Sequence, residues 1–338
     1  FSSKVPVELV YAFGHTPVRL FPTLGKQEFS DPYLPRNYCS LVRSIFANQV
    51  ECMEDNEASS VDGVIFTNTC DAVRLLRDVW QTYVPVPVVS FFEFPRQKTS
   101  HSVRYAIQSL YSLIKDLEHF SGQTLRAEEL SYAVRVYNKQ RELRLIWRTE
   151  WLKGHIALSD YLAFRKACLT QDPEIQREPV VVDSSAMLST SRLPRILLLG
   201  SLSVRDDLVL LIHELGGRVF GEDSDIDERA ITAEICSEGT IPELLEKIVL
   251  TYFEMRPSPY DHQVARRVEY IDQLITDRQI DAVICSYYKF CDPFFFFFPA
   301  IKKTLDRRNI PILLLEDVAE ARISGQMRTR LEAFLEML

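Results

Sequence analysis

Short apolar runs rich in valine, isoleucine and leucine alternate along this chain with longer segments of helical periodicity. Apolar runs of this length are typical of buried strands, and helices between them favour a parallel sheet. The pattern predicts strands at Pro17–Phe21, Gly63–Thr67, Val86–Phe91, Arg195–Gly200, Arg218–Phe220, Asp281–Ser286 and Pro311–Leu315. It predicts helices at Arg36–Val50, Asp71–Tyr83, Ser100–Phe120, Ala127–Trp151, Val204–Leu215, His262–Thr276, Pro299–Arg308 and Gly325–Leu338. We therefore expect an α/β protein with parallel sheets.

Two stretches of the chain repeat the same order of features. Each has an apolar strand that begins after an aspartate, then a Cys-Asp pair, then a helical segment and a second strand near a proline. The pair is Cys70-Asp71 in the first stretch and Cys291-Asp292 in the second. This is the order of a βαβ unit. The repeat predicts two similar Rossmann-like lobes, over residues 1–125 and 191–338, joined by a helical segment over residues 126–190.

The position of these cysteines has a chemical consequence. Ligands of open parallel sheets bind beyond the carboxyl ends of the strands, where Cys70 and Cys291 are expected. Each thiol also precedes a helix, whose N-terminal amides favour a thiolate. Cys39 lies near the start of another predicted helix and could supply a third ligand. If the lobes face each other, these thiols converge in the cleft between them.

The chain has seven cysteines, and none of them forms a C-x-x-C pair. The odd count in a chain of 338 residues disfavours a secreted disulfide scaffold, so we expect reduced thiols and a cytoplasmic protein. Single cysteines are often simply buried, and we expect this of Cys168 and Cys236. The surroundings of Cys52 and Cys285 leave a ligand role open. Dispersed thiolates gathered by a fold suit an iron–sulfur cluster.

Charge and motifs exclude several classes of function. The net charge of −8 makes nucleic acid a poor partner. The sequence has no HExxH, GxGxxG or Walker lysine motif, which disfavours a zinc hydrolase and nucleotide binding by this chain. No apolar run approaches the length of a membrane span. We expect neither nucleic acid nor a membrane among the partners.

Several stretches, in order along nearly the whole chain, together resemble a known family. They are Ser3–Leu9, Pro17–Arg19, Leu34–Cys39, Asp62–Ile65, Asn68–Ala72, Lys289–Pro293 and Gly325–Leu338. The chain resembles the 2-hydroxyacyl-CoA dehydratases, a family that includes benzoyl-CoA reductase subunits. The resemblance implies a heterodimer of two related subunits that hold iron–sulfur clusters, typically 4Fe–4S, through three cysteines each. It also implies a separate ATP-hydrolysing iron–sulfur activator and an acyl-CoA substrate.

The chemistry implied by this resemblance is radical dehydration. One low-potential electron reaches the thioester carbonyl, gives a ketyl radical anion and allows the β-hydroxyl to leave. On the same resemblance, Cys39, Cys70 and Cys291 are the cluster ligands. Ser3 stands where the family often has a hydroxyl or thiol near substrate and cluster, and Glu8 matches a family carboxylate. These two are the candidate catalytic residues, although Glu8 could equally form a cap or a salt bridge.

Some positions depart from the family pattern. Lys4 stands where tyrosine is usual, Val7 stands where glutamate is usual, and Gly221–Ser224 lacks the Cys-Thr-Gly pattern of the substrate-activating subunit. These departures favour the subunit that relays the electron. Three alternatives remain open: a benzoyl-CoA-type reductase subunit, a double-cubane relative that would recruit Cys52 and Cys285, and a non-catalytic electron-transfer or scaffold paralogue.

Overall fold

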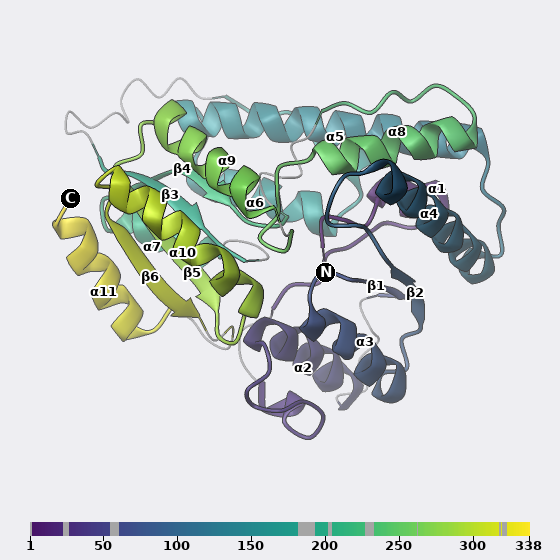
Figure 1. Ribbon diagram of the computed structural model, residues 1–338, viewed down its shortest axis with the longest axis horizontal. Coiled ribbons are helices and arrows are strands. Elements are labelled where there is room, and N and C mark those ends of the chain that lie inside the picture. Colours follow the sequence, from purple (N-terminus) through teal and green to yellow (C-terminus); the bar gives the residue numbers. More distant parts are fainter. Residues whose placement is uncertain are drawn as a thin grey trace.

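The computed structural model describes residues 2–22, 27–54, 61–181, 193–201, 205–226, 233–261, 263–317, 319 and 323–338. Within these residues the chain forms two separate parallel sheets (Figure 1). The smaller sheet pairs β1 (Val64–Thr67) with β2 (Val88–Phe92). The larger sheet has the order β4-β3-β5-β6, with β3 at Arg195–Leu199, β4 at Arg218–Asp223, β5 at Ala282–Tyr288 and β6 at Ile312–Asp317. The predicted α/β class with parallel pairing is confirmed.

Helices surround both sheets. They are α1 (Val7–Ala12), α2 (Ser40–Glu54), α3 (Asp71–Tyr83), α4 (Ser100–Ser121), α5 (Ala127–Lys153), α6 (Leu158–Thr170), α7 (Asp206–Glu214), α8 (Ile241–Glu254), α9 (Val264–Asp277), α10 (Asp292–Arg307) and α11 (Gly325–Glu336), with short 3-10 turns at Gln27–Ser30 and Pro173–Ile175. Every residue of β5 is buried, as expected for a central parallel strand covered on both faces. None of the helices in the described ranges is both long and apolar enough to cross a membrane.

Local sequence signals account for the helix that follows β1. Helix α3 buries Val73, Leu76 and Trp80, which recur on one face of the helix. The indole of Trp80 donates a hydrogen bond to the carbonyl of Val86, 3.1 Å away, where the chain approaches β2. The side chain of Trp80 thereby joins helix α3 to the strand that completes the unit.

The long helix α5 contributes side chains to two separate hydrophobic clusters. Near its start, Leu130 and Val134 pack into the same cluster as residues of α1, α4 and α8. Near its end, Trp151 packs into the cluster that covers the larger sheet. The expected middle segment is therefore helical, but its helix links the packing of the two halves. Its predicted boundary near residue 190 lies outside the described residues.

Some expected elements differ in the structure. The predicted strand at Pro17–Phe21 is wrong: the segment forms no strand, and the Arg19 amide instead donates to the carbonyl of Leu169 at the end of α6. The last predicted helix before β6 begins at Asp292 rather than at Pro299, since Pro293 fits the first turn of α10. Helix α2 begins at Ser40, later than predicted. Helices α1 and α8 were not predicted, and α6 lies within the middle segment that was predicted only in general as helical.

Candidate functional site

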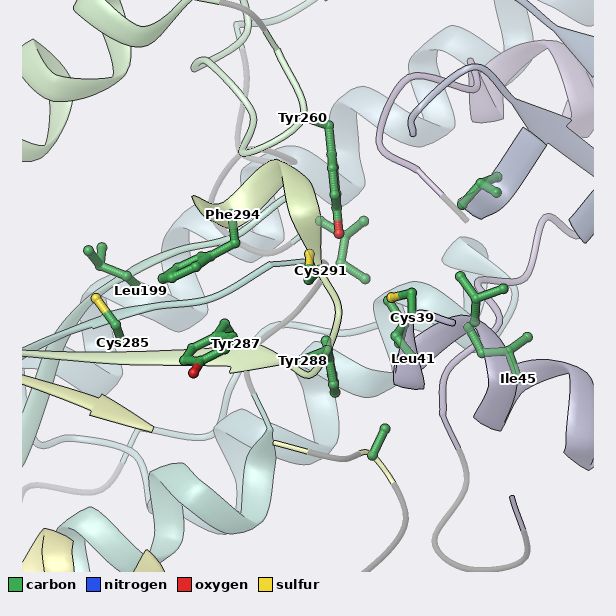
Figure 2. Close-up of a cluster of buried hydrophobic side chains, with 14 of the residues drawn as sticks. Cys39, Leu41, Ile45, Leu199, Tyr260, Cys285, Tyr287, Tyr288, Cys291 and Phe294 are labelled. Carbon is green, nitrogen blue, oxygen red and sulfur yellow. The ribbon is translucent and has the colours of Figure 1, made fainter. Parts of the chain in front are cut away.

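The three candidate thiols line one pocket, although they come from distant parts of the sequence. Cys70 lies between β1 and α3, Cys291 lies between β5 and α10, and Cys39 directly precedes α2. All three line a pocket of about 830 Å³. In Figure 2, Cys39 and Cys291 lie near each other, and the hydroxyl of Tyr260 points toward both. The structure therefore brings together the three cysteines that the sequence predicted to converge: the two of the repeated Cys-Asp pairs, and Cys39.

Backbone contacts hold the three segments in place. The amide of Ser40 donates to the carbonyl of Lys289 across 3.1 Å, which joins the start of α2 to the turn before Cys291. The hydroxyl of Tyr38 donates to the carbonyl of Ala72, 2.7 Å away, which joins the same segment to α3. Because these bonds flank Cys39 on both sides, the thiol is fixed relative to both Cys-Asp turns.

The turn before Cys291 has an unusual backbone. Phe290 adopts a φ of 62°, in the left-handed region that side-chain-bearing residues seldom occupy. The amide of Cys291 then donates to the carbonyl of Tyr288, 3.0 Å away, and closes a tight turn at the end of β5. This turn places Cys291 directly at the N-terminus of α10.

The three thiols differ in their electrostatic surroundings. The thiol of Cys39 donates a hydrogen bond to Cys291, which raises the pKa of Cys39 and lowers that of Cys291. The buried hydroxyl of Ser201 and the amide of Phe294 further lower the pKa of Cys291. Burial raises the pKa of Cys70 to about 12, although amides of α3 oppose the shift. Negative charge is therefore best accommodated first at Cys291.

Aromatic side chains form much of the pocket wall. Tyr260 lies close enough to all three thiols that their charges raise the pKa of its hydroxyl, after the larger effect of its burial. Phe295, Phe296 and Phe297 of α10 also line the pocket. Arg96 is a lining residue as well, and its guanidinium donates to carbonyls of the loop before Cys70. Tyr260 and Arg96 were not predicted from the sequence, because neither stands in a motif.

Ser3 and Glu8 lie outside this set of lining residues. The amide and hydroxyl of Ser3 both donate to Asp225, at 2.9 and 3.1 Å. Glu8 is fully buried, forms an ion pair with Arg141 and accepts a hydrogen bond from Tyr252. Glu8 thus forms a salt bridge, which was one alternative to a catalytic role on the basis of the sequence. The catalytic assignment of both residues stays a prediction.

The remaining cysteines also lie away from the described pocket lining. Cys285 is buried within β5, and Figure 2 shows it well apart from Cys291. Cys52 is partly buried in α2, Cys168 is buried in α6, and Cys236 is exposed. The expectation that Cys236 is a buried filler is wrong: its thiol faces solvent and accepts a hydrogen bond from Lys247, 3.4 Å away.

The chemistry of the donor set is compatible with an iron–sulfur cluster. The three thiols are soft ligands of the kind that iron–sulfur clusters use. In the described parts of the chain, no group of three or more His, Cys, Asp or Glu side chains is arranged to hold one ion. Cluster thiolates bind different iron atoms, so they need not approach one common centre. Three thiols around one pocket of this size match that requirement.

Comparisons with known proteins point to one family. The family model of the 2-hydroxyglutaryl-CoA dehydratase D-component matches residues 2–338. The chain is 22% identical to the (R)-phenyllactyl-CoA dehydratase beta subunit of Clostridium sporogenes, covering 98% of this chain and 89% of that protein. It is 24% identical to the (R)-2-hydroxyglutaryl-CoA dehydratase beta subunit of Acidaminococcus fermentans, covering 99% and 90%.

A reductase is similar over a comparable range. The chain is 23% identical to one of the benzoyl-CoA reductase subunits of Thauera aromatica, covering 96% of this chain and 85% of that protein. The resemblance noted in the sequence is therefore confirmed. Since the family model matches almost every residue, the chain belongs to the 2-hydroxyglutaryl-CoA dehydratase D-component family, a family of acyl-CoA dehydratase and reductase subunits.

Proposed function

We propose that this chain is the iron–sulfur subunit of an ATP-activated 2-hydroxyacyl-CoA dehydratase, and that Cys39, Cys70 and Cys291 hold its cluster, most simply 4Fe–4S. The observation that carries the proposal is the convergence of these three thiols on one pocket. They lie at the starts of three helices, and two of them end the equivalent strands β1 and β5. This arrangement supports a cluster site in a cleft between two Rossmann-like lobes.

When bound, such a cluster would supply one low-potential electron toward an acyl-CoA thioester, so that a ketyl radical forms and water is eliminated. The residues of this chain prepare the site in two ways. The Cys39 thiol and the Ser201 hydroxyl favour negative charge at Cys291. Tyr260 and the phenylalanines of α10 line the pocket beside the thiols with aromatic rings, and a cluster bound there would have an apolar wall on that side.

The proposed partners are a paralogous second subunit, an ATP-hydrolysing iron–sulfur activator and an acyl-CoA. Two relatives are named as beta subunits and a third as one subunit of a reductase, which supports an assembly with a second chain. Phe296 of the pocket is 76% exposed and Phe295 is 44% exposed. Apolar side chains left open beside a pocket are suited to contact with a partner.

Electron relay is the proposed role of this subunit, rather than activation of substrate. Ser3, the candidate hydroxyl near substrate, is held by Asp225 and is buried. Glu8 is fully occupied by Arg141 and Tyr252. Neither side chain is among the described lining of the thiol pocket, which supports a pocket arranged for a cluster rather than for substrate turnover.

A benzoyl-CoA-type reductase subunit is the second candidate, favoured by the similarity to the benzoyl-CoA reductase of Thauera aromatica. The test uses the assembled complex with activator and ATP, kept without oxygen, and compares a 2-hydroxyacyl-CoA with an aromatic acyl-CoA. We expect turnover of the 2-hydroxyacyl-CoA and about four iron atoms per chain. Turnover of the aromatic thioester alone would favour the reductase, and about eight iron atoms would favour the double-cubane alternative.

The same complex tests the alternative that this chain is a non-catalytic paralogue. We expect Cys291→Ala to remove both iron and turnover, because the thiol lies at the centre of the proposed site. Loss of iron with full turnover of the complex would contradict an essential role of the cluster in this chain and would support a scaffold.

A further inference from the structure

A second, smaller pocket lies where the N-terminal segment meets α5, α6 and α8. Its volume is about 60 Å³, and Arg19, Tyr137, Gln140, Arg141 and Arg144 line it. Among the described residues, neither Asp nor Glu is part of its lining, and it shares no lining residue with the thiol pocket. Three arginines therefore line one small space.

The charges of these arginines are only partly compensated. Arg141 forms an ion pair with Glu8, and both oxygens of Glu8 are occupied, since the second accepts from Tyr252. The guanidinium of Arg19 donates to the main-chain carbonyl of Ser2, which carries no full charge. Burial lowers the pKa of Arg19, which is the expected effect on a cation that is poorly compensated.

Other carboxylates near the pocket are engaged elsewhere. Asp225 acts on Arg19 electrostatically but accepts hydrogen bonds from Ser3 and Ser258. Asp172 and Glu174 both accept from the hydroxyl of Tyr11.

One buried polar group of the pocket lacks a partner among the described residues. Arg144 is 7% exposed, and one of its terminal nitrogens donates to the carbonyl of Cys168, 3.3 Å away. Its Nε, however, has no hydrogen-bond partner within the described structure. Tyr137 also lines the pocket, and no described residue makes a hydrogen bond to its hydroxyl. A buried donor without a partner costs free energy, so a ligand that accepts from Arg144 and also reaches the hydroxyl of Tyr137 would be favoured.

We propose that this pocket binds a small oxyanion, held by Arg19, Arg141 and Arg144 and by the hydroxyl of Tyr137. Guanidinium groups match the paired oxygens of phosphate and carboxylate groups, and such charge-assisted bonds are stronger than neutral ones. Pockets for larger organic ligands span about 300–1,000 Å³, so this one suits a single anionic group rather than a whole coenzyme. The bound anion joins the N-terminal segment to α5, because Arg19 lies on the first and the other three residues lie on the second.

The test is thermal unfolding of the full chain at constant ionic strength, with inorganic phosphate, acetate or chloride as the probe. An anion that binds the native state raises Tm as its concentration rises. We expect such a rise with phosphate or acetate and not with chloride. Arg144→Gln should weaken the binding by about tenfold, which corresponds to the loss of about 1.4 kcal/mol. Tyr137→Phe should weaken it by a few-fold.

Matched variants of α5 serve as controls. Arg135→Gln and Tyr132→Phe remove the same groups from exposed positions of the helix and should leave the Tm response unchanged. Since Arg144→Gln could disturb the core, Tyr137→Phe, which keeps the ring, is the deciding variant if the first does not fold. An equal response in Tyr137→Phe and Tyr132→Phe would overturn the proposal. So would no response to either oxyanion, or an equal response to chloride. The measurement needs no cluster, so its failure leaves the proposed function standing.

Discussion

The turn that carries Cys70 and the turn that carries Cys291 have the same parts in the same order. Each joins a parallel strand to a helix that begins at the aspartate after the cysteine. Their surroundings differ, however. Strand β1 belongs to a two-stranded sheet, whereas β5 is an inner strand of a four-stranded sheet. The pKa of Cys70 is raised and that of Cys291 is lowered.

Neighbouring side chains, rather than the turns themselves, explain this electrostatic difference. Both thiols lie at helix N-termini and both receive hydrogen bonds from backbone amides of the following helix. Only Cys291 also receives a hydrogen bond from the thiol of Cys39 and a contribution from Ser201. A repeated backbone motif can therefore present two thiols of unequal acidity to one pocket, because residues outside the motif decide which carries charge.

The largest predicted effect concerns the core beside the first turn. Trp80 is fully buried and packs against Phe46 and Phe66. We expect Trp80→Ala to lower the free energy of unfolding by about 3–5 kcal/mol, because it leaves a large cavity and removes the bond to Val86. Denaturant unfolding measures this loss. Trp80→Phe removes the hydrogen bond but keeps most of the side-chain volume, so it should lower the free energy of unfolding much less. An equal decrease in both variants would show that packing is not the main contribution of Trp80 to stability.

Backbone strain distinguishes the second turn from the first. Phe290 has a φ of 62°, whereas Thr69, which precedes Cys70, has no positive φ. A branched residue is strongly disfavoured in the left-handed region, so Phe290→Val should lower the free energy of unfolding by about 1–2 kcal/mol. Phe290→Gly should cost less than Phe290→Val, since glycine adopts this conformation freely. The reverse order of stabilities would contradict the strained turn.

A pH response is expected beside the larger sheet. The ring of His213 accepts a hydrogen bond from the amide of Val219, 3.2 Å away, so it joins α7 to β4 much as Trp80 joins α3 to β2. Burial, and secondarily Arg218, lower the pKa of His213 to about 4. The unfolded chain then binds this proton more readily, so the stabilisation by the neutral ring is lost as the pH falls from about 6.5 toward 4.

Because the ring of His213 is partly exposed, we expect about 1 kcal/mol of this loss between pH 7 and pH 5. Unfolding by denaturant at the two pH values measures it in the wild type and in His213→Gln. The variant keeps an acceptor that does not titrate, so its stability should change less. The same pH dependence in both proteins would show that other groups cause it.

The sequence predicted the strands and the repeated turns well because each carries its own local signal. The Cys-Asp pair marks the end of a buried strand, and the helix that follows Cys70 was predicted at its observed bounds, Asp71–Tyr83. For Cys39, the sequence indicated only a position near the start of a helix. Its proximity to the other two thiols depends on contacts between distant segments, such as the hydrogen bond between Ser40 and Lys289.

Other features depend wholly on distant contacts. Pro17–Phe21 has the composition of a strand, but its backbone meets the end of α6 instead of another strand. The roles of Tyr260 and Arg96 in the pocket follow from the packing of separate segments. Neither residue has a neighbour in sequence that could have indicated its place, so no local pattern predicted them.

The central claim is that Cys39, Cys70 and Cys291 together hold one iron–sulfur cluster. The most direct measurement is the iron and sulfide content of the anaerobically purified protein, with an EPR spectrum after reduction, for alanine variants of each cysteine. We predict about four iron atoms per chain in the wild type and in Cys285→Ala, and loss of most iron and of the EPR signal in each of the three pocket variants. Wild-type iron in any of the three pocket variants, or its loss in Cys285→Ala with the fold intact, would contradict the claim.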